Sequence, residues 1–216
     1  MNRDAQQFSN EGYVVIDDLL NVDEIEHVDH ELESFPSDGP GDRRLLDREW
    51  CRLLGHVIRH RLLKRRLLYL ATQPVLCTYF NKDADTNWGV NLHRDLHVPL
   101  NQPFDHPRWG NWSEKQGIPH AQAPRDLLAT MLAVRVSIDA CDAGDGALCV
   151  VPGSQATADV DSARIECTGP RGYAVVMSPL LLHASIKSQS GRPRRVLHFL
   201  FGPSALPDGA QWYYAP

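Results

Sequence analysis

Apolar positions near the start of the chain repeat at the spacing of an amphipathic helix. Asn21 and Glu24 have the form of a capping box, in which the two side chains satisfy free backbone N–H groups at a helix start. The apolar residues that follow lie three or four positions apart: Ile25, Val28, Leu32 and Phe35. This pattern predicts a helix over residues 22–35.

A second helical pattern covers residues 47–71 and carries many basic side chains between Arg52 and Arg66. A basic helix can bind nucleic acid or a membrane surface. However, the formal net charge of the 216 residues is -5, and no apolar run is long enough to span a membrane. We therefore interpret the basic residues as the solvated face of an amphipathic helix. We expect neither nucleic acid nor a membrane as a partner, and the oligomeric state stays open.

Short β-type runs replace the helical spacing from Pro74 onward, and another such run follows Gly12. The later runs cover residues 75–82, 90–100, 131–139, 147–151, 164–167, 173–178 and 194–201. Turn signals such as Asp145-Gly146 and Pro152-Gly153 separate them. Many short strands with such turns favour an antiparallel sandwich or barrel.

The chain length suits a single domain of residues 1–216. Within it we expect a helical part over residues 1–72, a β core over 73–204 and a tail over 205–216. Residues 101–126 have little periodicity but contain Trp109 and Trp112, which argue against disorder. A loop this long predicts either a lid over a pocket or a packed crossover connection.

Composition places the chain among soluble globular proteins, with 43% hydrophobic and 23% charged residues. The polar first residues lack the apolar core of a signal peptide, so we expect a cytoplasmic protein. The five cysteines include no Cys-x-x-Cys pair, and we expect buried free thiols rather than disulfides or a zinc site.

The main candidate for chemistry is His93-x-Asp95. Residues two apart on an extended chain point to the same side, so this imidazole and carboxylate can bind one metal ion. The pair forms two-thirds of the 2-His-1-carboxylate triad of non-haem Fe(II) oxygenases. His183 ends an apolar run and is a candidate third ligand, while a packed core histidine is the alternative.

Arg194 lies eleven residues after His183, at the head of a strand that is largely apolar on both faces. A buried Arg needs an anionic partner, and its planar guanidinium suits a carboxylate. A dicarboxylate that binds the metal at one end and Arg194 at the other explains both residues. That co-substrate is 2-oxoglutarate.

These four residues and their spacing resemble the phytanoyl-CoA dioxygenase-like (PhyH) family of Fe(II)/2-oxoglutarate oxygenases. Further segments agree with the family pattern: Gly12-Tyr13-Val14-Val15, Asn87-Trp88, residues 145–154, Leu182-His183-Ala184-Ser185 and residues 194–199. The similarity covers most of the chain.

The resemblance implies a mainly β fold with flanking helices, a double-stranded β-helix or cupin-like jelly roll. It implies Fe(II) on His93, Asp95 and His183, with O2 as a further co-substrate. It also implies 2-oxoglutarate on Arg194 and Ser185, with Arg135 beside it. Candidate substrate contacts are a separate set: Trp109, Trp112, His120 and Gln122.

Related halogenases lack the carboxylate that Asp95 supplies, so the resemblance indicates a hydroxylase that acts on a C–H bond of a small molecule and releases succinate and CO2. The sequence departs from the family pattern twice. Arg94 stands where Gln is usual, and we expect it to point away from the metal; Gln155 stands where His is common. The chain is compact for the family, which favours a small metabolite over a bulky acyl-CoA.

Two other functions fit the same residues. The first is a cupin-like metabolite-binding or sensing protein that keeps the fold without turnover. The second is a zinc or manganese cupin that uses no 2-oxoglutarate.

Overall fold

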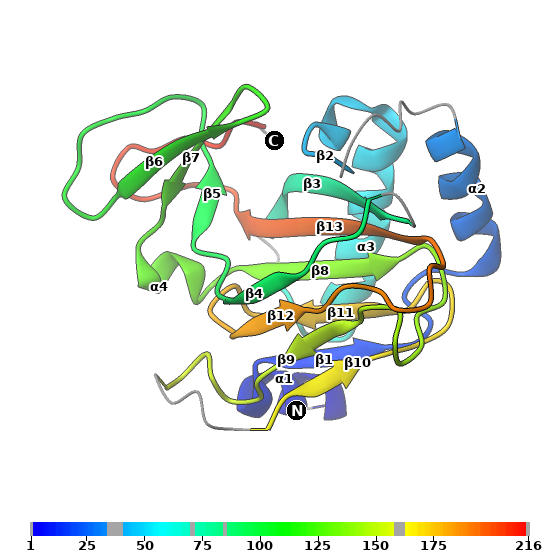
Figure 1. Cartoon of the computed structure of the whole chain (residues 1–216). Coiled ribbons are helices and arrows are strands. Elements are labelled where there is room, and N and C mark those ends of the chain that lie inside the picture. The colour runs from blue at the N-terminus through cyan, green and yellow to red at the C-terminus, as the bar shows by residue number, and fades with distance from the viewer. Residues whose placement is uncertain (1, 34–40, 70–71, 84–85, 158–162, 215–216) are drawn as a thin grey trace.

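The computed structural model describes residues 2–33, 41–69, 72–83, 86–157 and 163–214, and their strands form three antiparallel sheets (Figure 1). The six-stranded sheet runs β1 (Tyr13–Ile16), β11 (Ala174–Met177), β8 (Leu132–Ser137), β13 (Arg194–Pro203), β3 (Thr72–Lys82) and β2 (Gly41–Asp42). The four-stranded sheet runs β10 (Ile165–Cys167), β9 (Leu148–Val150), β12 (His183–Ser185) and β4 (Val90–His93). The three-stranded sheet runs β5 (His97–Pro99), β7 (Ile118–Gln122) and β6 (Gly110–Lys115).

Helices cover one face of the six-stranded sheet, and the four-stranded sheet covers the other (Figure 1). These helices are α1 (Arg3–Glu11), α2 (Val22–Glu33), a 3₁₀ turn (Leu45–Asp47) and α3 (Glu49–Lys64). Helix α4 (Arg125–Leu128) lies apart from them, and its Leu127 and Leu128 belong to the core between the sheets. One apolar core lies between the two sheets and includes Val150, Val175 and Leu200. A second core lies between the large sheet and α2 and α3, and includes Phe199 and Ile58. This arrangement is the expected jelly roll with flanking helices.

The capping box at the start of α2 is present as predicted. Asn21 Oδ1 accepts from Glu24 N and Glu24 Oε2 accepts from Asn21 N, each at 2.9 Å. The helix extends to Glu33, and predicted residues 34–35 lie outside the described part. The alternation of buried and exposed positions in α2 places Ile25, Val28 and Leu32 in the helix-facing core.

The second predicted helix is shorter than the pattern indicated. Of the predicted range 47–71 it covers residues 49–64, because Arg66 adopts a left-handed conformation with φ 57°; residues 70–71 lie outside the described part. Leu67 N then donates to Leu62 O at 2.9 Å, a bond that closes the helix end. The helical apolar spacing did not predict this backbone reversal, because leucines continue beyond Arg66 in the sequence.

Much of the 101–126 segment, expected to be an irregular lid or crossover loop, is a β-hairpin of β6 and β7 paired with β5. Its two-residue turn has Gln116 at φ 53° and Gly117 at φ 78°, the conformation that matches the twist of a tight hairpin. The polar sequence of β6 hid the strand, because none of its six residues is buried and an apolar face is therefore missing from the pattern.

All five cysteines are buried and free, as expected.

Helix α1 was not predicted; Asn2 caps it by accepting from Ala5 N, and Gly12 ends it at φ 79°. Among the described residues, none of the helices is long and apolar enough to cross a membrane.

Gly12 provides a test of this packing because both its backbone and its lack of a side chain matter. A Cβ there would lie 2.3 Å from Gln155 Oε1 and 2.9 Å from Leu181 Cδ1, whereas Gly209, at φ 76°, has nothing within 4 Å. We expect Gly12→Ala to lower the free energy of unfolding by about 2–3 kcal/mol and Gly209→Ala by about 1 kcal/mol, the cost of left-handed backbone alone. Urea denaturation measures both, and equal losses would contradict a packing role for Gly12.

Candidate metal centre and cavity

Pairing of β12 with β4 places the two candidate histidine ligands side by side. His183 lies opposite His93 in the antiparallel register, and their ring centroids are 4.2 Å apart. His183 is buried and His93 is half-buried. Since successive strand residues face opposite sides, this register turns both rings toward the same side of the sheet.

Asp95 lies just beyond β4 rather than within one continuous strand over residues 90–100. The chain leaves the four-stranded sheet after His93 and joins the three-stranded sheet at His97. In the break, Asp95 N donates to Pro179 O at 2.9 Å, which ties Asp95 to the segment that leads into β12. The carboxylate therefore still meets both imidazoles, at 3.6 Å from each Nε2.

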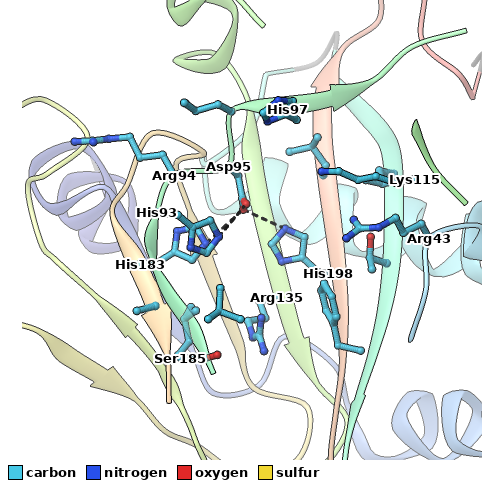
Figure 2. A pocket seen from close by; sticks show the side chains of 18 of the residues that line it. Arg43, His93, Arg94, Asp95, His97, Lys115, Arg135, His183, Ser185 and His198 are labelled. Carbon is cyan, nitrogen blue, oxygen red and sulfur yellow. Dashed lines mark ion pairs between the residues drawn. The ribbon is translucent and has the colours of Figure 1, made fainter. Parts of the chain in front are cut away.

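Arg94 points away from this cluster, as predicted (Figure 2). Its guanidinium donates to the carbonyls of Leu180, Ser154 and Thr157 at 2.7, 2.8 and 3.0 Å. It thereby joins the ligand-bearing strand to the turn after β9 and to the loop before β12. Gln155, the other departure from the family pattern, lies in that turn and donates to Asn10 O at 3.3 Å.

The three side chains fit a metal ion. One ligand atom from each of His93, Asp95 and His183 lies within 4.8 Å of the others. Each ring also has its Nδ1 beside a backbone carbonyl, at 2.8 Å for Asn91 O and 3.0 Å for Leu181 O. A carbonyl accepts, so both Nδ1 atoms carry hydrogen and both Nε2 lone pairs are free to bind a metal.

The Asp95 carboxylate gives the cluster a negative charge that a metal cation can balance. Burial raises the pKa of Asp95, but His183, His93 and His198 outweigh it and hold that pKa well below its usual range. Asp95 Oδ2 is buried without a hydrogen-bond partner in the described structure. His198 Nε2, on β13, lies 3.5 Å from this oxygen, and burial lowers the pKa of His198 to about 4. A neutral His198 therefore faces an ionised Asp95.

A cavity of about 360 Å³ opens over the cluster, a size typical of sites for small ligands. All three candidate ligands line it, together with His198. Figure 2 shows their side chains pointing into the same space.

Cationic groups converge at the end of this cavity near Ser185. Arg194 is buried and is not itself among the lining residues, but its charge acts on Lys82 and Arg135, which are. Its Nε and Nη2 have no hydrogen-bond partner within the described residues. Burial lowers the pKa of Arg194; burial and then Arg194 lower the pKa of Arg135 to about 10. Lys82 Nζ lies 3.3 Å from Ser185 Oγ, and burial, Arg194 and Arg135 lower its pKa to about 7.

The sequence-predicted substrate residues divide between the cavity and its surroundings. His120 lines the cavity. Trp109 is instead a core residue whose Nε1 donates to Asp208 Oδ2 at 3.0 Å. Trp112 packs edge-on against Phe104, and Gln122 accepts from Asn111 Nδ2; neither is among the lining residues.

Several lining residues were not assigned from the sequence as site residues, among them Arg43, Lys82, Lys115 and His198. The sequence did contain a signal for Lys82, because this residue shares a face with Thr78 and Phe80 on the strand predicted over residues 75–82. Arg43 and Lys115 carried none, because they belong to distant segments that only the folded chain brings together.

Comparisons with known proteins agree with this fold. Residues 8–196 match the family described as "Phytanoyl-CoA dioxygenase (PhyH)". A search of curated proteins found no match. Many solved structures are similar. Those described below are all under 25% identical, so they support the fold alone.

One such structure is the epimerase SnoN in complex with Fe3+, alpha ketoglutarate and nogalamycin RO, with 15% identity, a TM-score of 0.71 and coverage of 99% of this chain and 94% of that one. HygX from Streptomyces hygroscopicus, with nickel, 2-oxoglutarate and hygromycin B bound, has 14% identity, a TM-score of 0.65 and coverage of 94% and 87%. The carbocyclase SnoK from nogalamycin biosynthesis has 14% identity, a TM-score of 0.67 and coverage of 98% and 86%.

Metal binding to the three side chains should stabilise the fold. At a Co(II) concentration of about 100 times Kd, we expect about 2.7 kcal/mol of stabilisation, or a rise in Tm of about 5–10 °C. His183→Ala and Asp95→Ala should abolish most of that rise, while His106→Ala, which lies near Asp208 outside the cavity lining, should keep it. Equal Tm shifts in all four proteins would place the metal elsewhere.

Proposed function

Because the chain belongs to the phytanoyl-CoA dioxygenase (PhyH) family, we propose that it is an oxygenase that uses Fe(II), 2-oxoglutarate and O2 to hydroxylate a C–H bond of a small molecule. The observation that carries this proposal is the pairing of a His-Asp-His cluster with the buried guanidinium of Arg194, whose Nε and Nη2 lack hydrogen-bond partners in the described structure and whose charge acts on the cavity residues Lys82 and Arg135. The metal cluster alone fits other metals and other chemistry. The guanidinium adds the need for an organic anion.

In this proposal His93, Asp95 and His183 would hold Fe(II), and the metal would also bind the co-substrate and O2. When bound, iron and 2-oxoglutarate together supply the oxidant: 2-oxoglutarate and O2 yield succinate and CO2, and one oxygen atom enters the substrate. The protein holds the ligands in a fixed tautomer through the carbonyls of Asn91 and Leu181. His198 keeps a neutral imidazole beside the free oxygen of Asp95.

The distal carboxylate of 2-oxoglutarate is assigned to Arg194, with Ser185 as a second contact. An unpaired buried guanidinium is costly, so a bidentate carboxylate would stabilise the loaded protein. Arg135 and Lys82 add positive charge to the same end of the cavity. Together these residues select a dianion over a monoanion of similar size.

Hydroxylation is the outcome we assign because Asp95 is present in the triad, which leaves no vacated ligand position for halide. Structural neighbours include an epimerase and a carbocyclase, so the fold alone supports several oxidative outcomes. SnoN and HygX each hold a small molecule, nogalamycin RO or hygromycin B, which supports a small-molecule substrate here.

The rival function is a cupin-like protein that binds or senses a metabolite without turnover. It fits the same cavity and the same metal cluster. Release of succinate from 2-oxoglutarate in air, with Fe(II) and ascorbate, separates the two. Turnover that His183→Ala abolishes supports the oxygenase; no turnover by the wild-type protein with any member of a metabolite library supports the rival.

Arg194→Ala should raise the KM for 2-oxoglutarate by about a hundredfold, equivalent to about 2.7 kcal/mol, because one charged pair with the carboxylate is lost. Arg195→Ala is the matched control, since this neighbour on β13 pairs instead with Asp139 through its Nη2 at 2.6 Å. Circular dichroism checks that both variants fold. A zinc or manganese cupin that uses no 2-oxoglutarate would show no such KM effect.

Lys82 predicts a pH dependence of 2-oxoglutarate capture. Its pKa of about 7 in the free protein means that it loses its positive charge as pH rises through neutrality. The value of kcat/KM for 2-oxoglutarate should therefore fall above pH ~7, by up to about tenfold for one charged hydrogen bond. Lys82→Met should lack that fall. If kcat/KM depends on pH in the same way in the wild type and in Lys82→Met, Lys82 does not bind the co-substrate.

A further inference from the structure

Two cations face the cavity at a place separate from the Arg194 end. Arg43 follows β2, and Lys115 ends β6; both line the cavity and both are half-buried. In Figure 2 their charged ends point inward toward Asp95 and His198, while Arg135 and Ser185 lie at another side of the triad. Neither side chain makes an ion pair with an acidic residue in the described part of the chain.

The hairpin turn fixes these two residues beside each other. Gln116, next to Lys115, accepts from Arg43 N at 2.7 Å and donates to Gly41 O at 3.2 Å. The tip of the β6–β7 hairpin is thus bonded to the edge strand that leads into Arg43. Residues more than 70 positions apart in the sequence are brought to one wall of the cavity by this contact.

The charge of Arg43 also acts on Lys115. Burial and then Arg43 lower the pKa of Lys115, and burial lowers that of Arg43. Asp95 acts in the opposite sense on both groups.

Charge balance in the loaded cavity then calls for another anion. The lining includes the cations Arg43, Lys82, Lys115 and Arg135, and Asp95 is its one carboxylate among the described residues. Fe(II) adds two positive charges and 2-oxoglutarate removes two, so loading leaves the excess unchanged. The co-substrate's distal carboxylate is taken by the Arg194 end, which leaves Arg43 and Lys115 without a partner.

His120 lies beside the same pair and adds a hydrogen-bond acceptor. Its Nδ1 faces Ile118 O at 2.9 Å, so Nδ1 carries hydrogen and Nε2 keeps its lone pair. That Nε2 is buried without a partner in the described structure. Burial lowers the pKa of His120 to about 4, with Lys115 and Arg43 contributing, so the ring stays neutral.

We propose that Arg43 and Lys115 bind an oxyanion of the organic substrate, a carboxylate or a phosphate, with His120 accepting from a neighbouring hydroxyl or N–H group. This inference rests on the proposed oxygenase function and names the substrate class for its site. A guanidinium and an ammonium together suit an oxyanion with several acceptor oxygens. Anchoring that group at this wall orients the rest of the substrate toward the triad, which is how positioning contributes to catalysis.

The test uses the full chain loaded with Fe(II) and 2-oxoglutarate under nitrogen, and calorimetric titration at fixed pH and ionic strength. The probes are matched pairs: hexanoate with hexanamide, and hexyl phosphate with hexanol. We expect the anion of at least one pair to bind about tenfold or more tightly than its neutral partner, the effect of about 1.4 kcal/mol. Comparing hexanoate with hexyl phosphate then separates a carboxylate from a phosphate substrate.

The double variant Arg43→Gln/Lys115→Met should lose this preference for anions. Arg44→Gln is the control, because it removes the adjacent, exposed guanidinium that pairs with Asp47, and it should keep the preference. Equal binding of charged and neutral probes, no anion bound at millimolar concentration, or an unchanged preference in the double variant would each overturn the proposal.

Titration with 2-oxoglutarate distinguishes a failure of the proposed anion site from a failure of the oxygenase function on which it rests. The double variant should bind 2-oxoglutarate as the wild type does, whereas Arg194→Ala should not. If the wild type binds neither metal nor 2-oxoglutarate, the oxygenase function fails. The anion preference is then measured on the metal-free chain, where a preference that the double variant lacks still supports the anion site.

Discussion

The register between β4 and β12 is the constraint on which the site depends. It sets His183 opposite His93, and the bond from Asp95 N to Pro179 O holds the carboxylate against the same pair. A slip of one residue would turn one histidine to the other face of its sheet and separate the ligands. Arg94 stabilises the arrangement on the side away from the ligands. Its hydrogen bonds to three carbonyls join the ligand-bearing strand to the turn after β9 and to the loop before β12.

Around this centre, the cavity divides its positive charge between two places. The group formed by Arg194, Arg135 and Lys82 lies beside Ser185, and Arg43 and Lys115 occupy a different wall. Such a division lets one cavity bind two different anions in defined positions. Arg194 is buried with two unpaired nitrogens, and Arg43 and Lys115 make no ion pair with an acidic residue in the described part of the chain. We therefore interpret both groups as ligand-binding residues rather than as contributions to stability.

The sequence was most informative where chemistry is local. The His93-x-Asp95 spacing and the capping box at Asn21 rest on short-range patterns, whereas the family resemblance implied His183 as the third ligand. The structure brings the three candidate ligands together. The cations at the second wall escaped prediction because they come from distant segments, joined only by the turn at Gln116. That turn lies in a polar hairpin without clear alternation. Helix α3 is shorter than predicted because Arg66 reverses the backbone while the apolar spacing continues.

Anomalous diffraction from anaerobic crystals grown with Fe(II) and 2-oxoglutarate tests the central claim most directly. The account predicts an iron peak bounded by His93, Asp95 and His183, with 2-oxoglutarate bound to that metal and its distal carboxylate on Arg194. A peak outside this cluster, or a co-substrate whose distal carboxylate lies against Arg43 and Lys115 instead, would contradict it.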